Sequence, residues 1–396
     1  MKHNWEYKKL GDVCTIVGRI GFRGYKRSDY VEGLNDGAIS LSPSNINNGV
    51  LDYSKCTFIS WEKYKESPEI MIENGDVLLV KTASVGKSAY VEHLPHETTI
   101  NPQFVVLKHI SANHKYIAYV VKSNSFLLDL KSITFGSSVP TLSQKDLADL
   151  SIPVPPLSEQ SRIVAELDLL TGIIDKQNAQ LKELDNLAQA IFYDMFGDPV
   201  ENPKGWDVKN IGDIADVKIG PFGSLLHASD YINGGHPVIN PVHLKAGKII
   251  AEDDFTVNDD MYAQMMSYVL HKNDIVFGRR GDIGRCALVT QEQDGYLCGT
   301  GSLFVRFNIQ VQPLFSVATL MHKSITDFLL KKAKGATMLN INCGIVENIP
   351  FILPPLALQQ SFAEKIQAIE KQKEAIRASI TDTQKLLDYT MDKYFG

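Results

Sequence analysis

Basic residues and glycines alternate in a short stretch near the start of the chain. Four cations fall within nine residues, interleaved with glycines and with the aromatic residues Phe22 and Tyr25. Phosphate oxygens attract cationic side chains, and glycine lets the backbone approach a ligand closely. The stretch predicts a loop that contacts nucleic acid, with solvated surface turns as the alternative. Its candidate DNA-binding residues are Arg19, Arg23, Lys26 and Arg27.

A second basic stretch has a counterpart later in the chain. The segment 81–87 aligns with 279–285, and both are basic although their other residues differ. Two readers of different DNA sequences would show this pattern. Arginine pairs bidentately with guanine, and Ser, Thr or Asp can complete a base contact. The candidate residues of these two segments are Lys81, Thr82, Ser84, Lys87, Arg279, Arg280, Asp282 and Arg285. Further candidates are Ser224 and His227 in the glycine-rich stretch 220–227, and Lys245.

Motifs for catalysis are incomplete throughout the chain. Gly86-Lys87-Ser88 lacks the glycine that a phosphate-binding loop needs five residues earlier, where Lys81 stands. Asn101-Pro102-Gln103-Phe104 resembles the base-gripping N-P-P-F motif of amino-methyltransferases, but its second proline is missing. The five cysteines have no C-x-x-C spacing, which indicates reduced thiols rather than disulfides or zinc. We therefore expect a chain that is not an enzyme and holds no metal or cofactor.

Composition is that of a globular protein with two or three domains. The chain has 396 residues, of which 44% are apolar, and a net charge of −6. Most of this negative charge lies in 157–196, which has three basic and seven acidic residues, so the basic loops remain compatible with DNA. No apolar run of about 18 residues and no signal peptide is present. The expected location is the cytoplasm, without membrane contact.

A long helix is predicted after the segment Pro155-Pro156-Leu157-Ser158-Glu159-Gln160. From Ile163 to Met195 apolar residues recur at alternating steps of four and three, which is the seam of a coiled coil. Proline suits the first turn, and Gly197 provides the stop signal. At 1.5 Å per residue, about 40 residues make a rod of about 60 Å.

The same pattern recurs at the end of the chain. Pro354-Pro355-Leu356, Gln359 and the final Phe395-Gly396 each lie 199 residues after their counterparts, and a second seam runs between them. Two such stripes are best buried against each other. An antiparallel pair is favoured because a whole domain separates the helices, with a parallel pair left open. The other interpretation is that each helix packs only on its own domain.

The two globular regions are also duplicated. Trp5 and Leu10-Gly11-Asp12 open the first, as Trp206 and Ile211-Gly212-Asp213 open the second. Short apolar runs predict strands, and helices are expected at 116–130 and 313–333. The predicted fold is α/β (α+β), pseudo-twofold, with two globular domains and an antiparallel intramolecular coiled coil. The predicted divisions are a first domain at 1–152, a central helix region at 153–197, a second domain at 198–351 and a C-terminal helix region at 352–396.

The order of domain, P-P-L-x-x-Q segment and long helix ending in Phe-Gly, repeated twice, resembles the specificity subunit of type I restriction-modification systems. The resemblance implies two target-recognition domains, each reading one half of a bipartite site in double-stranded DNA, with the helices as a ruler. It also implies as partners two modification subunits that methylate adenine with S-adenosylmethionine, and restriction subunits that translocate and cleave DNA. S-adenosylmethionine, ATP and Mg are then expected only in those partners.

Two other classes stay open at this point. A recognition subunit from a related system that cuts on both sides of its site would have nearly the same sequence pattern, and its neighbouring subunits would distinguish it. A scaffold whose duplicated domains bind protein or sugar is the third possibility. Salt-sensitive retention of DNA is expected only of the first two.

Overall fold

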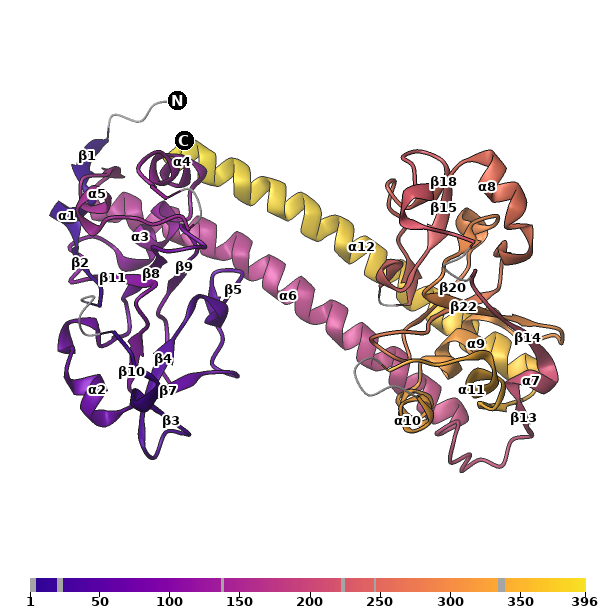
Figure 1. The fold of residues 1–396 in the computed structure, drawn as a ribbon. Helices are drawn as coiled ribbons and strands as arrows, with labels where there is room; N and C mark the ends of the chain where they lie inside the picture. The colour runs from indigo at the N-terminus through magenta and orange to yellow at the C-terminus, as the bar shows by residue number, and fades with distance from the viewer. Residues whose placement is uncertain (1–4, 20–23, 137–138, 222–224, 246, 334–338) are drawn as a thin grey trace. The chain divides into compact units, whose positions relative to one another are not determined.

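The computed structural model describes residues 5–19, 24–136, 139–221, 225–245, 247–333 and 339–396 (Figure 1). The chain forms two compact units. Unit 1 consists of Met1–Asn178 with Arg377–Gly396, and unit 2 of Ala179–Ile376. Each unit therefore contains one globular part and one section of each of two long helices, α6 (Leu157–Phe196) and α12 (Leu356–Phe395).

Unit 1 is built on two four-stranded sheets. The first sheet is antiparallel. Its strands β8 and β11 are rich in buried β-branched and other apolar residues, so this sheet lies at the centre of the fold. The second contains one parallel pair, β4 with β10. The first sheet has the order β2 (Thr15–Val17), β11 (Phe104–Lys108), β8 (Val77–Val80) and β9 (Ser88–Tyr90). The second has the order β10 (Thr98–Ile100), β4 (Gly37–Leu41), β7 (Thr57–Ser60) and β3 (Tyr30–Val31).

Smaller elements complete unit 1. In the described part of unit 1, two further antiparallel strand pairs and five short α-helices accompany the sheets. The pairs are β1 (Glu6–Lys9) with β12 (Ser151–Val154), and β5 (Ile46–Asn47) with β6 (Val50–Leu51). The helices are α1 (Leu10–Val13), α2 (Trp61–Lys65), α3 (His114–Val120), α4 (Asn124–Ser132) and α5 (Gln144–Ala148).

Unit 2 repeats these elements in the same order except β3, which is replaced by an isolated bridge between Ile232 and Thr256, and this confirms the duplication. Its central sheet is β14 (Ala215–Ile219), β22 (Ser302–Phe307), β19 (Ile275–Gly278) and β20 (Cys286–Leu288). The second is β18 (Thr256–Val257), β15 (His236–Ile239) and β21 (Leu297–Cys298), with β15 and β21 parallel. The pairs are β13 (Val208–Asn210) with β23 (Pro350–Ile352), and β16 (Leu244–Lys245) with β17 (Lys248–Ile249). The helices are α7 (Ile211–Ile214), α8 (Asp259–Gln264), α9 (Pro313–Leu320), α10 (Lys323–Lys332) and α11 (Cys343–Glu347).

The single helices expected at 116–130 and 313–333 are each two helices. The break in unit 1 falls before Ser123, whose side chain accepts a hydrogen bond from the backbone N–H of Phe126 and so caps a new helix. In unit 2 the side chain of His322 caps α10 by accepting from the N–H of Ser324. In both units a capping side chain therefore starts a second helix at a place where apolar periodicity alone predicts one continuous helix.

An ion pair lies at the same place in both units. In unit 1 the Lys108 ammonium is 2.8 Å from the Asp76 carboxylate, and both side chains are 7% exposed. In unit 2 the Arg306 guanidinium is 2.6 Å from Asp274. The two units thus share even this polar contact, which joins strand β11 or β22 to the residue directly before strand β8 or β19.

The two long helices run antiparallel in each unit, as predicted. In unit 1 the start of α6 meets the end of α12, where the Tyr394 hydroxyl donates to the Glu166 carboxylate at 2.7 Å. In unit 2 the end of α6 meets the start of α12, where the Phe196 and Phe362 ring centroids are 5.4 Å apart. The helix ends also enter the globular cores, through Ile163 among others. Each helix therefore packs on its partner and on a globular part.

A glutamine in each P-P-L-x-x-Q segment fastens the long helix to its globular part. The Gln160 amide nitrogen donates to the carbonyl of Pro155 at 2.7 Å, while its oxygen accepts from the N–H of Asn113 at 2.7 Å. Gln359 makes the same two bonds, at 2.8 and 3.0 Å. Both side chains are almost fully buried. The glutamine is therefore a junction: it gives a hydrogen-bond partner to the carbonyl before the long helix and to the backbone N–H of the residue that caps α3 or α9.

Removing this junction should destabilise unit 2. In a Gln359→Ala variant the Pro354 carbonyl and the Gln312 N–H lose their partners inside the protein, which costs about 1–2 kcal/mol of unfolding free energy. A lower urea midpoint for unit 2 is the expected result. Gln360→Ala, at the exposed neighbouring position, is the matched control and should change stability by less than about 0.5 kcal/mol. Equal midpoints for both variants would contradict the junction.

Candidate nucleic-acid interface

The loops that carry the predicted basic residues of unit 1 meet at one edge of its sheets. Strands β4 and β10 are parallel, so their carboxyl ends lie together. Strand β11 begins there, and β2 and β8, both antiparallel to β11, end there. The backbone N–H of Lys81 donates to the Gln103 carbonyl at 2.8 Å, which joins the β8 loop to the turn before β11. We call the described residues of the loops after β2 and β8, together with this turn, the loop edge.

Arg19 supports the loop edge from within. Its guanidinium lies 3.9 Å from the centre of the Tyr25 ring and donates to the Tyr25 hydroxyl at 2.9 Å. That hydroxyl in turn donates to the carbonyl of Ile100 at 2.8 Å. Arg19 is only 3% exposed, so it orders the loop instead of presenting its charge to a ligand.

Unit 2 has the same loop edge, formed by the loops after β14 and β19 and the turn before β22. The N–H of Gly220 donates to the Ser302 carbonyl, and the N–H of Arg279 to the Gly301 carbonyl, both at 3.0 Å. The Arg279 side chain is 7% exposed, and its Nε donates to the carbonyl of Thr300 at 3.1 Å. Burial, assisted by the charge of Arg280, lowers the pKa of Arg279. Arg279 therefore braces this turn.

Lys87 and Arg285 are equivalent residues that brace a neighbouring turn. The Lys87 ammonium donates to the Pro43 carbonyl at 2.7 Å, and the Arg285 guanidinium to the Pro241 carbonyl at 3.1 Å. Arg285 also pairs with Asp282 at 2.7 Å. Much of the charge that the sequence places in these loops thus binds the protein's own backbone.

The remaining predicted residues differ in position. Exposed side chains at the two loop edges belong to Lys26, Arg27, Ser84, His227, Arg280 and Asp282. Lys81 and Thr82 are half-buried there, and burial lowers the pKa of Lys81. Lys245 lies apart from the loop edge, in the β16–β17 hairpin, where it pairs with Glu252 at 3.5 Å. Arg23 and Ser224 lie outside the described residues.

Polar residues outside the predicted DNA-binding set also lie at the loop edge, and two of them, Asn101 and Gln103, belong to the incomplete N-P-P-F-like motif of the sequence. In unit 1 the Asn101 side chain bonds both the backbone N–H and the side-chain oxygen of Gln103, at 2.9 and 3.0 Å. Thr82 also forms a β-bridge with Thr141, as Arg280 does with Asn340 in unit 2. Asn and Gln are the side chains that pair bidentately with adenine. For Asn101 and Gln103 the signal in the sequence was that motif, in a turn directly before β11.

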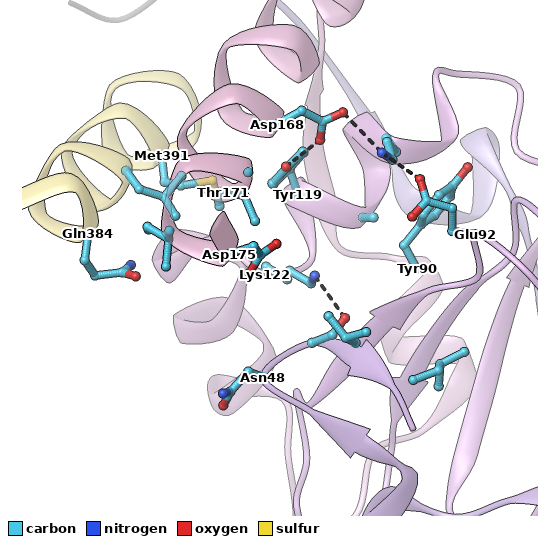
Figure 2. Close-up of a pocket in the computed structure, with 18 of the residues that line it drawn as sticks. Asn48, Tyr90, Glu92, Tyr119, Lys122, Asp168, Thr171, Asp175, Gln384 and Met391 are labelled. Carbon is cyan, nitrogen blue, oxygen red and sulfur yellow. Dashed lines mark hydrogen bonds and ion pairs between the residues drawn. The ribbon is translucent and has the colours of Figure 1, made fainter. Parts of the chain in front are cut away.

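Unit 1 also contains a cleft of about 1060 Å³ between its globular part and its two helix sections (Figure 2). The Tyr119 hydroxyl donates to Asp168 at 2.7 Å, and the Lys115 ammonium lies 3.2 Å from the same carboxylate and 3.1 Å from Glu92. Burial raises the pKa of Tyr119 and lowers that of Lys122, whose ammonium donates to the Gly49 carbonyl at 3.4 Å. None of the predicted DNA-binding residues that the structure describes lines this cleft.

Metal and thiol chemistry depend on the placement of possible metal ligands and on the state of the cysteines in the described part of the chain. Within the described residues, no three His, Cys, Asp or Glu side chains are grouped so that they could hold a metal ion. The five cysteines are free, and burial raises the pKa of Cys14 to about 12, which disfavours the reactive thiolate. No helix in the described part of the chain is long and apolar enough to cross a membrane.

Comparison with known proteins decides the family. The family model for the type I restriction modification DNA specificity domain matches twice, at residues 2–186 and 203–382. The chain belongs to this family. The two matches coincide with the two copies of the specificity domain that the duplicated sheets and helices display, and the resemblance drawn from the P-P-L-x-x-Q segments is confirmed.

Relatives in this family are specificity subunits. The type I restriction enzyme MjaIX specificity subunit of Methanocaldococcus jannaschii is 24% identical over 389 residues, covering 92% of this chain and 87% of the relative. The EcoKI specificity subunit of Escherichia coli strain K12 is 24% identical over 314 residues, covering 74% and 66%.

Solved structures of the family share the fold. A chain from a study of the assembly and conformational transition of a type I restriction-modification system has a TM-score of 0.59 at 19% identity, covering 98% of this chain and 97% of that one. The type I S subunit from M. genitalium has a TM-score of 0.52 at 12% identity, covering 100% and 97%. The predicted mixed α and β fold with two long helices is thus confirmed.

Proposed function

We propose that this chain is the sequence-specific DNA-recognition subunit of a type I restriction-modification complex. The globular part of each unit reads one half of a bipartite site in double-stranded DNA, and the paired helices set the length of the unread spacer. The observation that carries this proposal is the loop edge, which has the same architecture in both units but different exposed side chains. Lys26, Arg27 and Ser84 in unit 1 align with His227, Ala228 and Asp282 in unit 2, and Arg280 of unit 2 aligns with Thr82 of unit 1.

The division of labour follows the boundaries drawn from the sequence. Residues 1–152 and 198–351 carry recognition, and 153–197 and 352–396 carry spacing. The positions of α6 and α12, which begin at Leu157 and Leu356, support this assignment. If both recognition domains enter the major groove from one face of the duplex, the half-sites lie about 34 Å apart, or one helical turn. A rod of about 60 Å spans that distance.

Partner subunits supply the chemistry. Two modification subunits that methylate adenine with S-adenosylmethionine dock on the helices, and restriction subunits that use ATP and Mg translocate and cleave DNA. This chain provides recognition without a catalytic group, and it acts in the cytoplasm. The names of the relatives, which are specificity subunits of type I restriction enzymes, support the part of this proposal in which the chain is one subunit of a larger enzyme.

A binding assay tests the proposal. The chain, assembled with its modification subunits, is mixed with a random pool of DNA duplexes at several salt concentrations. Retention should fall steeply as salt rises, because each phosphate that a cation neutralises releases counterions and adds about −0.9 to the log–log slope. The retained pool should be enriched in one sequence. Absence of retention, or retention that salt does not change, would refute DNA recognition.

A further inference from the structure

The seam of α12 contains one buried charge. Lys373 occupies a position where the four-three pattern calls for an apolar residue, and it is 8% exposed. Its ammonium lies 2.6 Å from the Asp185 carboxylate on α6 and 2.5 Å from Glu370 on its own helix. Burial alone would lower the pKa of Lys373, but the hydrogen bonds to these two carboxylates outweigh it and raise the pKa. The lysine is therefore charged and paired inside the helix pair.

Glu370 extends this contact to the globular part of unit 2. Its other carboxylate oxygen lies 3.3 Å from the ammonium of Lys248, the first residue of β17. Lys248, Glu370, Lys373 and Asp185 form what we call the ion cluster. It joins three elements of unit 2, which are the β16–β17 hairpin, α12 and α6.

Unit 1 has neutral residues at all four equivalent positions. The counterparts of Glu370, Lys373 and Asp185, found 199 residues away, are Thr171, Ile174 and Gln384. The counterpart of Lys248, by its place in the hairpin, is Val50. These four residues line the open cleft of unit 1, where Thr171 and Gln384 are labelled in Figure 2. Because unit 1 folds with neutral residues here, the ion cluster is not a requirement of the fold.

The ion cluster distinguishes one helix register from others. An apolar seam with a regular repeat can slip by one heptad and still bury its apolar residues. A slip of seven residues would place Asn178 or Phe192, neither of them acidic, where Asp185 now faces Lys373. Lys373 would then keep Glu370 of its own helix but lose Asp185, and a buried charge that loses a partner is disfavoured, whereas an apolar replacement of the whole pair is often neutral or stabilising. The lysine therefore contributes register more than stability.

We propose that Lys373 is a positioning residue that fixes the register of α6 and α12 in unit 2 and, through Glu370 and Lys248, the seating of that unit's globular part on the helices. This inference rests on the proposed function, because the register then determines which spacer and which second half-site the complex accepts. Unit 1 is independent of the ion cluster.

Lys373→Ile, which introduces the residue of unit 1, tests the inference. The purified complex with modification subunits methylates a DNA library in which the spacer and each half-site vary, and sequencing reads the products. The preference for the native spacer should fall about tenfold, and that for the second half-site should fall with it. The first half-site should be read as before. The thermal midpoint should change little, because Asp185 is half exposed and Glu370 keeps Lys248 as a partner, a result that a merely stabilising residue would not give.

Three further variants complete the test. Lys373→Arg keeps the charge and should retain the preference for the native spacer and second half-site. Lys371→Ile, on the exposed face of α12, should leave both preferences unchanged. Lys248→Val removes only the tie to the hairpin, so it should relax the second half-site while the native spacer stays preferred. It also serves as the decisive variant if Lys373→Ile does not fold.

Several results would overturn the inference. Unchanged preferences in folded Lys373→Ile would do so, and so would equal relaxation of both half-sites. If Lys373→Ile does not fold, an unchanged second half-site in Lys248→Val would refute it. Failure of the proposed function is a separate result, because the wild-type complex would then show no bipartite preference at all.

Discussion

An Arg280→Ala variant is expected to lose discrimination at the half-site read by unit 2 by about 10- to 100-fold, while the other half-site is read as before. Arg280 is exposed at the loop edge, next to the turn that Arg279 braces. A bidentate contact between arginine and guanine is worth about 1–3 kcal/mol of discrimination. Methylation sequencing on a library with one half-site varied at a time measures the effect.

Arg279→Ala is the matched control, one residue away. Its side chain is buried and donates to the Thr300 carbonyl, so its removal should lower the stability of unit 2 by about 1–3 kcal/mol. A uniform loss of affinity for all sequences in Arg280→Ala, with a salt slope smaller by about 1, would show that Arg280 contacts phosphate and would refute base recognition.

Insertion of one heptad into both long helices is expected to abolish recognition of the native site and to create recognition of a longer one. The insertions belong between Asn178 and Ala179 in α6 and between Ile376 and Arg377 in α12, where the two units divide. Seven residues add about 10.5 Å, which is about three base pairs at 3.4 Å each. The half-site sequences should stay the same because the loop edges are untouched.

An insertion into α6 alone is the control. It cannot keep the contacts of both units in register, since Gln177 bonds Ser379 in unit 1 and Asp185 bonds Lys373 in unit 2. Loss of stability and of sequence preference is expected. Methylation mapping of both variants decides the point, and an unchanged spacer in the doubly lengthened chain would contradict the helices' role in spacing.

The helices and the duplication could be predicted because their signals are local and regular. Ile163 and Phe362 head seams whose period of 3.5 residues determines both helical structure and a partner stripe. The offset of 199 residues found in the sequence is also the offset between α6 and α12, which begin at Leu157 and Leu356 and end at Phe196 and Phe395. The role of Gln160 and Gln359 needed the structure, because their partners, Asn113 and Gln312, lie far back in the sequence.

The candidate site could be predicted only as a set of loops. Arg19, Lys87 and Arg279 have the charge and the glycine-rich surroundings of DNA contacts, yet their side chains bind Tyr25, Pro43 and Thr300. Whether a loop cation faces outward depends on which carbonyls or rings the fold brings beside it. That information is absent from the composition of the loop.

The measurement that tests the account most directly is the sequence motif of DNA methylated by the complete complex, compared with the motif after residues 198–351 are exchanged for those of another family member. We predict two short defined segments separated by an unread spacer of fixed length, with only one segment changed by the exchange. A single uninterrupted motif, or a change in both segments, would contradict the account.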